Sequence, residues 1–241
     1  MSGDALIEVS DLVLDRGGRR VLDIAHLRVD RGRAILLCGA NGSGKTTLLK
    51  TLAGLLVASG GNFHCLGSPM TPTAGARFCR GRYIYLHQTP YMFDGTVADN
   101  VAYGLGQRGR DRAQRHLEIR DALVWAELDH LIARPALQLS TGEQQRVALV
   151  RARILAPPLL LLDEITANMD SASRQRTHAM LSDLERAGSS VILATHDPAA
   201  AALAHAERID LDAGRLVAPS RSAGPAEVIP LHRNLARPDG S

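Results

Sequence analysis

The stretch "GANGSGKT", residues 39–46, decides the fold that this sequence predicts. It matches the pattern G-x-x-x-x-G-K-[ST], in which glycines let successive backbone N–H groups point into one concavity that holds phosphate. An apolar run (33–40) precedes it and a helix-like stretch (45–56) follows it, so the N-terminus of a helix adds its dipole there. We expect Lys45 to reach the β- and γ-phosphates of a nucleotide and the Thr46 hydroxyl to bind Mg²⁺.

Two carboxylates end a second apolar run, "LLLLDE" (159–164). The carboxyl ends of the strands in an open parallel sheet form the edge where ligands bind. We therefore expect Asp163 to hold Mg²⁺ and Glu164 to orient and deprotonate an attacking water. An ordinary strand end would explain this run alone, but not its pairing with the phosphate loop. His196 follows the next apolar run, and we expect it to point at the γ-phosphate rather than to be a structural histidine.

Apolar runs alternate with helical periodicity along the rest of the chain. This alternation predicts an α/β fold with a mostly parallel sheet that helices cover on both faces. The expected strands are 5–14, 21–30, 33–40, 83–87, 158–164 and 190–195, with a terminal hairpin at 207–217. The expected helices are 45–56, 171–187 and a short one from Pro198. The mainly helical block at about 89–150 interrupts the alternation and should form a separate lobe.

Composition narrows the class of protein. Residues 1–217 are expected to form one domain, and 218–241, rich in Pro, Ala, Ser and Arg, a loosely ordered tail. Aromatic residues make up only 3% of the chain and the net charge is +3, so we expect no nucleic-acid partner. The three cysteines form no CxxC pair, which favours a reducing, cytosolic compartment. No apolar run approaches the roughly 20 residues of a membrane helix, so a membrane role would need a partner.

Five motifs together resemble the nucleotide-binding subunit of an ATP-binding cassette (ABC) transporter. They are "GANGSGKTT" (39–47), Gln88 in "YLHQTPYMF" (85–93), "LSTGEQQR" (139–146), "LLLLDEITANMD" (159–170) and "THD" (195–197). The resemblance runs from about residue 6 to residue 217. It implies a P-loop NTPase (RecA-like) core with an inserted helical subdomain and an N-terminal antiparallel β subdomain. It also implies an ATPase that uses ATP and Mg²⁺ to drive transport.

The resemblance implies a head-to-tail homodimer in which each ATP lies between the phosphate loop of one copy and the "LSTGE" of the other. The Ser140 hydroxyl and the Gly142 backbone N–H would then face the γ-phosphate in trans. Gln88 would touch Mg²⁺ and the attacking water, and Asp170 would end a loop that crosses the dimer seam. The residues expected at the nucleotide are Arg16, Val21, Gly39, Asn41, Gly42, Ser43, Gly44, Lys45, Thr46, Thr47, Ser140, Gly142, Glu143 and Asp170. The expected catalytic residues are Glu164, His196 and Gln88, and the expected metal ligands are Thr46, Gln88 and Asp163.

The sequence departs from the family pattern in three places. Thr141 and Glu143 replace Gly and Gln of the usual Leu-Ser-Gly-Gly-Gln, and a carboxylate near a triphosphate should weaken ATP-driven dimerisation. Arg16 stands where an aromatic residue usually stacks on adenine; its planar guanidinium can stack on a base or point to solvent. Ile165 replaces the proline that usually follows Glu164, which should loosen that turn.

The resemblance also suggests partners. The segment 89–101 would face an integral membrane permease, with exposed Tyr91, Met92 and Phe93 forming a socket for a short partner helix; a plain core cluster is the alternative. The stretch 83–105 is similar to that of tungstate-type oxyanion importers. The expected protein is thus the ATP-hydrolysing subunit of an importer, peripheral on the cytoplasmic face of the inner (cell) membrane and indirectly served by a solute-binding protein.

Other classes remain as alternatives. One is a soluble ABC ATPase that remodels a macromolecule, and another is an ATPase for a different solute or an exporter. A P-loop kinase or GTPase shares the phosphate loop, but the stretch "LSTGEQQR" and His196 argue against it.

Overall fold

A six-stranded sheet forms the centre of the molecule. The computed structural model describes residues 5–105, 112–167, 169–196 and 206–217; the expected short helix from Pro198 and the tail 218–241 lie outside these ranges. The strand order is β10-β9-β3-β8-β7-β6. Pairing is parallel except between the last two strands, which form the predicted hairpin. The strands are β3 (Ala34–Cys38), β6 (Ile84–Leu86), β7 (Leu159–Asp163), β8 (Ser190–Thr195), β9 (Glu207–Asp212) and β10 (Arg215–Val217).

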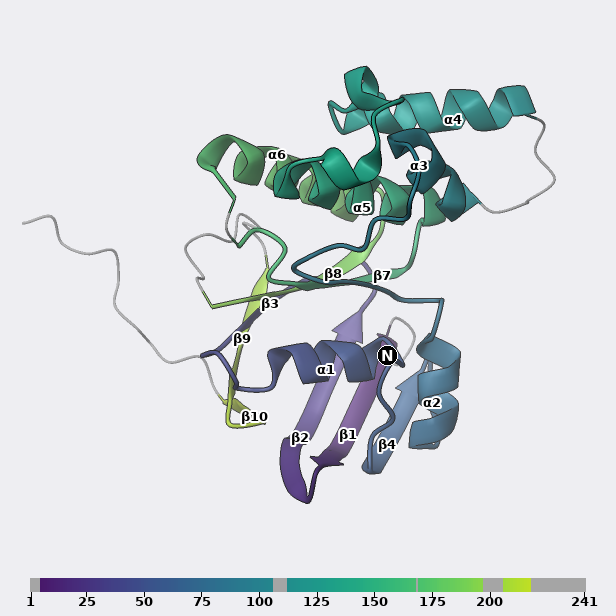
Figure 1. Cartoon of the computed structure of the whole chain (residues 1–241). Helices are drawn as coiled ribbons and strands as arrows, with labels where there is room; N and C mark the ends of the chain where they lie inside the picture. The colour runs from purple at the N-terminus through teal and green to yellow at the C-terminus, as the bar shows by residue number, and fades with distance from the viewer. Residues whose placement is uncertain (1–4, 106–111, 168, 197–205, 218–241) are drawn as a thin grey trace, which may run out of the picture.

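The central strands are apolar along their whole length because both faces of the sheet are covered. Every residue of β3, β7 and β8 is buried. Helices α3, α4, α5 and α6 lie on one side of the sheet, and α1 lies on the other, between this sheet and a second one (Figure 1). Two hydrophobic clusters result, one on each face. The predicted α/β fold with a mostly parallel sheet is therefore confirmed.

The layer above the sheet contains the predicted helical block. Its helices are α3 (Val97–Leu105), α4 (Arg112–Trp125) and α5 (Thr141–Leu155), which lie between β6 and β7 in the chain, and it packs beside α6 (Ser171–Arg186). Residues 89–96 are not helical and α5 continues past residue 150, so the predicted limits of the block describe it only roughly. The division of the chain into a domain and a tail stays a prediction.

A second, antiparallel sheet has the order β2-β1-β4-β5 and packs against α1. The two predicted N-terminal strands are present, but β4, β5 and α2 were not predicted, and α1 ends earlier than expected. The sequence from 60 to 70 holds glycine and proline and is short; it becomes a strand because it pairs with β1. The elements are β1 (Ala5–Arg16), β2 (Arg19–Asp30), α1 (Lys45–Leu52), β4 (Gly60–Cys65), β5 (Ser68–Met70) and α2 (Pro72–Cys79).

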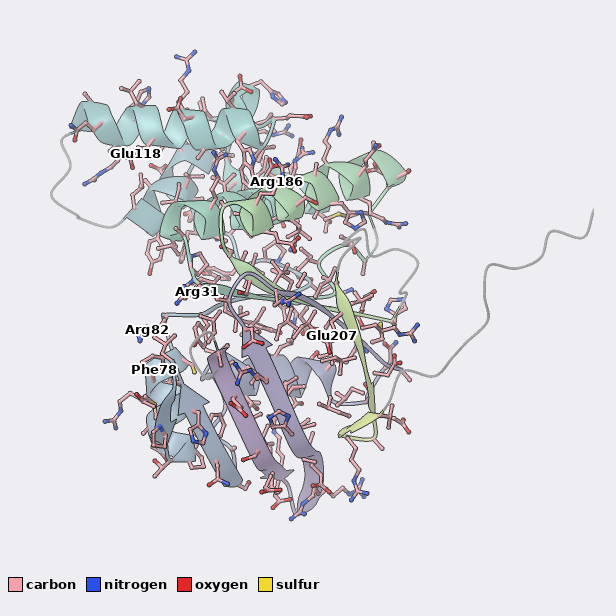
Figure 2. All side chains as sticks on the ribbon, turned by 180° about the vertical axis from the view of Figure 1, so that it is seen from behind. Arg31, Phe78, Arg82, Glu118, Arg186 and Glu207 are labelled. Atoms are coloured by element: carbon pink, nitrogen blue, oxygen red, sulfur yellow. The ribbon has the colours of Figure 1, made fainter. Side chains whose placement is uncertain are left out.

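Helix α2 begins with a capping residue and a proline, which are typical of a helix N-terminus. Thr71 caps the helix by accepting a hydrogen bond from the Ala74 N–H, and Pro72 occupies the first turn. At the other end of this helix the Arg82 guanidinium stacks on the Phe78 ring at 4.0 Å, on the outer side of the molecule (Figure 2). Within the residues that the structure describes, none of the helices has the length and apolar character needed to cross a membrane.

Candidate nucleotide site

The phosphate loop connects the end of β3 to the start of α1. Gly44 caps α1 with φ 110° and has no side chain that could cap the helix, so the backbone N–H groups of the first turn are open to a ligand. Gly39 has φ 151°, and a Cβ there would lie 2.2 Å from the Leu211 carbonyl oxygen, so only glycine fits. The hairpin turn closes the loop from outside, because the Gly214 N–H donates to the Ser43 carbonyl and the Gly214 carbonyl accepts from the Asp23 N–H, both at 2.8 Å.

Lys45 lies inside this loop and is 5% exposed. Its Nζ donates to the Gly39 carbonyl at 2.7 Å and the Ala40 carbonyl at 3.1 Å. The same Nζ lies 3.7 Å from Glu164 Oε1. The loop therefore holds a positive charge at the point where its N–H groups converge, which favours a phosphate group.

The two carboxylates end β7, as predicted. Asp163 is 4% exposed and accepts a hydrogen bond from the Tyr85 hydroxyl at 2.7 Å. Glu164 has φ 51°, a left-handed conformation that is uncommon for glutamate, and its N–H donates to the Ala194 carbonyl at 3.0 Å. Glu164 Oε2 lies 3.2 Å from His196 Nδ1, so the carboxylate stands between a lysine and a histidine. Strained backbone of this kind persists where the surrounding structure fixes it, often at functional sites.

One cavity of about 550 Å³ collects these groups. It is lined by Val21, Asn41, Gly42, Gly44, Lys45, Thr46, Thr47, His87, Gln88, Asp163, Glu164, Ala167 and His196. His87 and Ala167 were not predicted, although each lies next to or near a predicted residue in the chain. Gly39 supplies a carbonyl to Lys45, and the Ser43 hydroxyl is buried in the loop with no hydrogen-bond partner among the residues that the structure describes. The donors that face the cavity include a hydroxyl, an amide and two carboxylates, which is the oxygen-rich set that Mg²⁺ prefers.

Besides Gly39 and Ser43 of the phosphate loop, five predicted residues do not line this cavity. Arg16 lies exposed at the end of β1, opposite Arg19. Ser140, Gly142 and Glu143 form the start of α5, and Asp170 caps α6 by accepting from the Ser173 N–H at 2.8 Å. A Cβ on Gly142 would lie 3.1 Å from the Ser173 hydroxyl, so the two helix N-termini are neighbours.

Ser140 and Glu143 form a capping box. The Glu143 carboxylate accepts from the Ser140 N–H at 2.7 Å and from its hydroxyl at 2.8 Å, and Ser140 Oγ in turn accepts from the Glu143 N–H. Burial alone would raise the pKa of Glu143, but the bonds from Ser140 and nearby arginines lower it. Hydrogen bonds from the backbone and hydroxyl of Ser173 lower the pKa of Asp170. Both caps are therefore ionised at neutral pH.

The segment after Gln88 is only partly as predicted. Tyr91 is exposed, but Met92 is buried in the cluster beneath α3 to α6, so the expectation that Met92 lies on the surface is wrong. Ile165, which stands where the family pattern has proline, is also fully buried in that cluster and makes aliphatic contacts there.

Comparison with known proteins agrees with this arrangement. The sequence profile described as ABC transporter matches residues 22–167, which is more than half of the chain. The chain belongs to the ABC transporter family. The predicted family, P-loop NTPase fold and enzyme class, an ABC-type ATPase, are thereby confirmed.

Relatives of this ABC cassette serve transport in both directions. It is 38% identical over 215 residues to the Sulfate/thiosulfate import ATP-binding protein CysA 2 of Chromobacterium violaceum, covering 88% of this chain but 57% of that protein. It is 36% identical over 210 residues to the Cytochrome c biogenesis ATP-binding export protein CcmA of Bordetella bronchiseptica, covering 86% and 90%. The chain thus spans little more than half the length of the first relative.

A solved structure has the same fold. The structure of cbiO1 from Clostridium perfringens, part of the ABC transporter complex cbiONQ, superposes with a TM-score of 0.78 at 25% identity, covering 89% of this chain and 88% of that one. The cassette architecture therefore extends over almost all of this chain.

Proposed function

We propose that this chain is the ATP-hydrolysing subunit of a transporter and that it drives a separate membrane permease. The observation that carries the proposal is the single cavity where the phosphate loop, Glu164 and His196 meet. Lys45 and the first turn of α1 would bind the β- and γ-phosphates. Glu164 would take the proton of the attacking water, and His196, bonded to it, would hold that carboxylate toward the γ-phosphate.

The cavity supports Mg²⁺ as the companion of ATP. Thr46, Gln88 and Asp163 bring a hydroxyl, an amide and a carboxylate to this cavity. Mg²⁺ typically uses one or two carboxylates and completes its shell with substrate phosphates and water. When bound, the cation would neutralise charge on the phosphates; the protein groups would fix its place.

A head-to-tail pair of copies would complete the site. Ser140 and Gly142 stand at an exposed helix N-terminus away from the cavity of their own chain, which suits a role in a second copy. Ser140, Gly142 and Asp170 are proposed to face the seam, and Val21 and Arg16 to lie near the adenine. The helix dipole would stabilise negative charge on the γ-phosphate in trans.

The permease would dock on the segment 89–101. Tyr91 and the nearby Tyr103 are 74% and 70% exposed, and Phe93 packs between their rings. Arg151 fixes this surface from below, donating to the Tyr91 carbonyl at 2.7 Å and the Asn100 carbonyl at 3.0 Å. A preformed aromatic surface of this kind suits a short helix of a partner.

Import of an oxyanion is the proposed direction and cargo, with tungstate first. Similarity to a sulfate/thiosulfate import protein supports it, whereas similarity to a cytochrome c biogenesis export protein supports the alternative of export. The subunit would lie on the cytoplasmic face of the cell membrane, and a solute-binding protein would deliver the cargo to the permease. Deleting this protein should abolish tungstate uptake at nanomolar supply and leave sugar uptake intact. Normal uptake of tungstate, molybdate, sulfate and phosphate would sink the oxyanion proposal while leaving the ATPase proposal standing.

The ATPase itself is tested with Glu164→Gln. The purified variant should bind ATP but turn over about 10²-fold more slowly or worse, the usual scale for losing a general base. It should also accumulate an ATP-bound dimer in size-exclusion chromatography. Hydrolysis close to the wild-type rate would remove Glu164 from its assigned role.

A further inference from the structure

Tyr85 contacts the proposed metal site without lining the cavity. It lies in the middle of β6, in register with Leu161 of β7, two residues before Asp163. Its hydroxyl donates to Asp163 Oδ2 at 2.7 Å, and the carboxylate that accepts this bond is 4% exposed. A phenol has one proton to give, so this bond commits one of the two carboxylate oxygens to Tyr85.

The bond leaves the second oxygen, Oδ1, for another ligand. The Tyr85 hydroxyl is the donor in this bond, because an ionised carboxylate can only accept. Lys50 Nζ lies 5.7 Å from the ring centroid, which adds a contact to the ring on the side of α1. The side chain that touches Asp163 is thus held by both the sheet and a helix.

The orientation of the Asp163 carboxylate matters because it is the one charged group among the three side chains that we assign to Mg²⁺. Among the described residues, no group of three or more His, Cys, Asp or Glu side chains is placed to hold a metal ion. A divalent cation in the cavity would therefore depend on one well-placed carboxylate, neutral oxygen donors and the phosphates themselves. Partners that orient a metal-binding carboxylate commonly change metal affinity 10- to 100-fold when they are mutated.

We propose that Tyr85 is a positioning residue that holds Asp163 so that Oδ1 faces the divalent cation bound with ATP. The proposal rests on the proposed function, because it assigns Tyr85 to the same ATP site. Tyr85 does not touch the nucleotide; it acts only through Asp163.

The test is Tyr85→Phe, which removes one oxygen atom and keeps the ring. Binding of a fluorescent ATP analogue is measured as a function of Mg²⁺ and, separately, in EDTA. The Mg²⁺ concentration that gives half of the Mg²⁺-dependent binding should rise about 10-fold in the variant. Affinity in EDTA should stay within about twofold of wild type. Binding, unlike turnover, reports on the site even if the rate of chemistry also changes.

Tyr83→Phe is the matched control. Tyr83 is two residues away, its hydroxyl is buried, and it donates to the Leu6 carbonyl at 2.7 Å, away from the cavity. Its loss should lower the thermal unfolding temperature without moving the Mg²⁺ midpoint. In an Asp163→Asn background, Tyr85→Phe should have no added effect on Mg²⁺, because the group it positions is gone.

The outcomes separate the two proposals. Wild-type protein that binds the analogue with an Mg²⁺ requirement, together with an unchanged midpoint in folded Tyr85→Phe, overturns the role of Tyr85 and spares the ATP site. An equal shift in Tyr83→Phe also overturns it, because the effect would then come from general destabilisation. Wild-type protein that binds no nucleotide at all would overturn both.

Discussion

Replacing Glu143 with glutamine should strengthen ATP-driven dimerisation. In the free chain the Ser140 hydroxyl donates to the Glu143 carboxylate at 2.8 Å. In the proposed dimer the same hydroxyl must donate to a γ-phosphate oxygen of the other copy, at a distance of about 2.7 Å. The carboxylate and the phosphate would then both lie within hydrogen-bond distance of one hydroxyl oxygen that has a single proton, which sets the two charges roughly 5 Å apart.

That separation fixes the size of the effect. Two unit charges at about 5 Å repel by roughly 3 kcal/mol at an effective dielectric of about 20, and by about 1 kcal/mol if water fully surrounds them. Glutamine removes the charge but keeps an acceptor for the Ser140 N–H, because Glu and Gln both serve in capping boxes. The net gain should therefore be about 1–3 kcal/mol per site, a roughly 5- to 150-fold shift.

The measurement is the ATP concentration at which half of the protein is dimeric. The oligomeric state is measured by light scattering. All variants carry Glu164→Gln as well, so that ATP is not hydrolysed during the titration. Glu143→Gln should lower the midpoint at least about fivefold. Ser140→Ala is the control, since it removes the hydroxyl that both partners need and should raise the midpoint. An unchanged or higher midpoint in Glu143→Gln would refute the repulsion that we infer.

Glu143→Gln should have the opposite effect on folding: the substitution that strengthens dimerisation should lower the stability of the folded chain near neutral pH. The folded-state pKa of Glu143 is lowered, so its carboxylate stabilises the folded chain when ionised and loses that contribution as pH falls through the folded-state pKa. Wild type should thus be more stable than Glu143→Gln near neutral pH. Thermal melting should show this difference shrinking as the pH falls below about 4.

Three further predictions concern other contacts. Ser140→Arg and Lys45→Ala should each abolish hydrolysis. Mixing the two variants should restore some activity, because a mixed dimer holds one intact composite site. Mixed dimers that form but show no activity would contradict the trans geometry. Arg16→Ala should weaken ATP affinity by about 0.5–2 kcal/mol if the guanidinium stacks on adenine, and an aromatic replacement should restore it; equal affinity in calorimetry would show that Arg16 points elsewhere. Trp125→Phe should cost about 1.5–3 kcal/mol in chemical unfolding, because the indole N–H donates to Asp183 at 2.7 Å in a half-buried place; no loss would mean that this bond adds nothing.

The sequence was most informative where local chemistry demands particular residues. The phosphate loop needs glycine at positions with positive φ, and buried parallel strands need continuous apolar runs, so both could be predicted from residues alone. The rule that strand ends share one edge also predicted that His196 lies at the edge where Glu164 stands, although not that its Nδ1 lies 3.2 Å from the Glu164 carboxylate.

What the sequence did not reveal depends on partners far away in the chain. Strand β4 forms because β1 offers it an edge, which no short-range pattern announces. The burial of Met92 follows from packing under α5, not from its neighbours Tyr91 and Phe93, which look equally apolar. Tyr85 was read as part of a buried strand; its hydroxyl has meaning only once β6 and β7 lie side by side.

The bonds that Gly214 makes imply an order of events during synthesis. Residues 39–46 leave the ribosome early, but the loop they form is held by the Gly214 N–H on Ser43, and Leu211 fills the space that Gly39 leaves open. Strand β9, which pairs with β3, is also made late. The phosphate loop therefore reaches its final shape only after the C-terminal hairpin has emerged. A nascent chain stalled before that point would carry the complete binding motif and still lack a finished pocket for ATP.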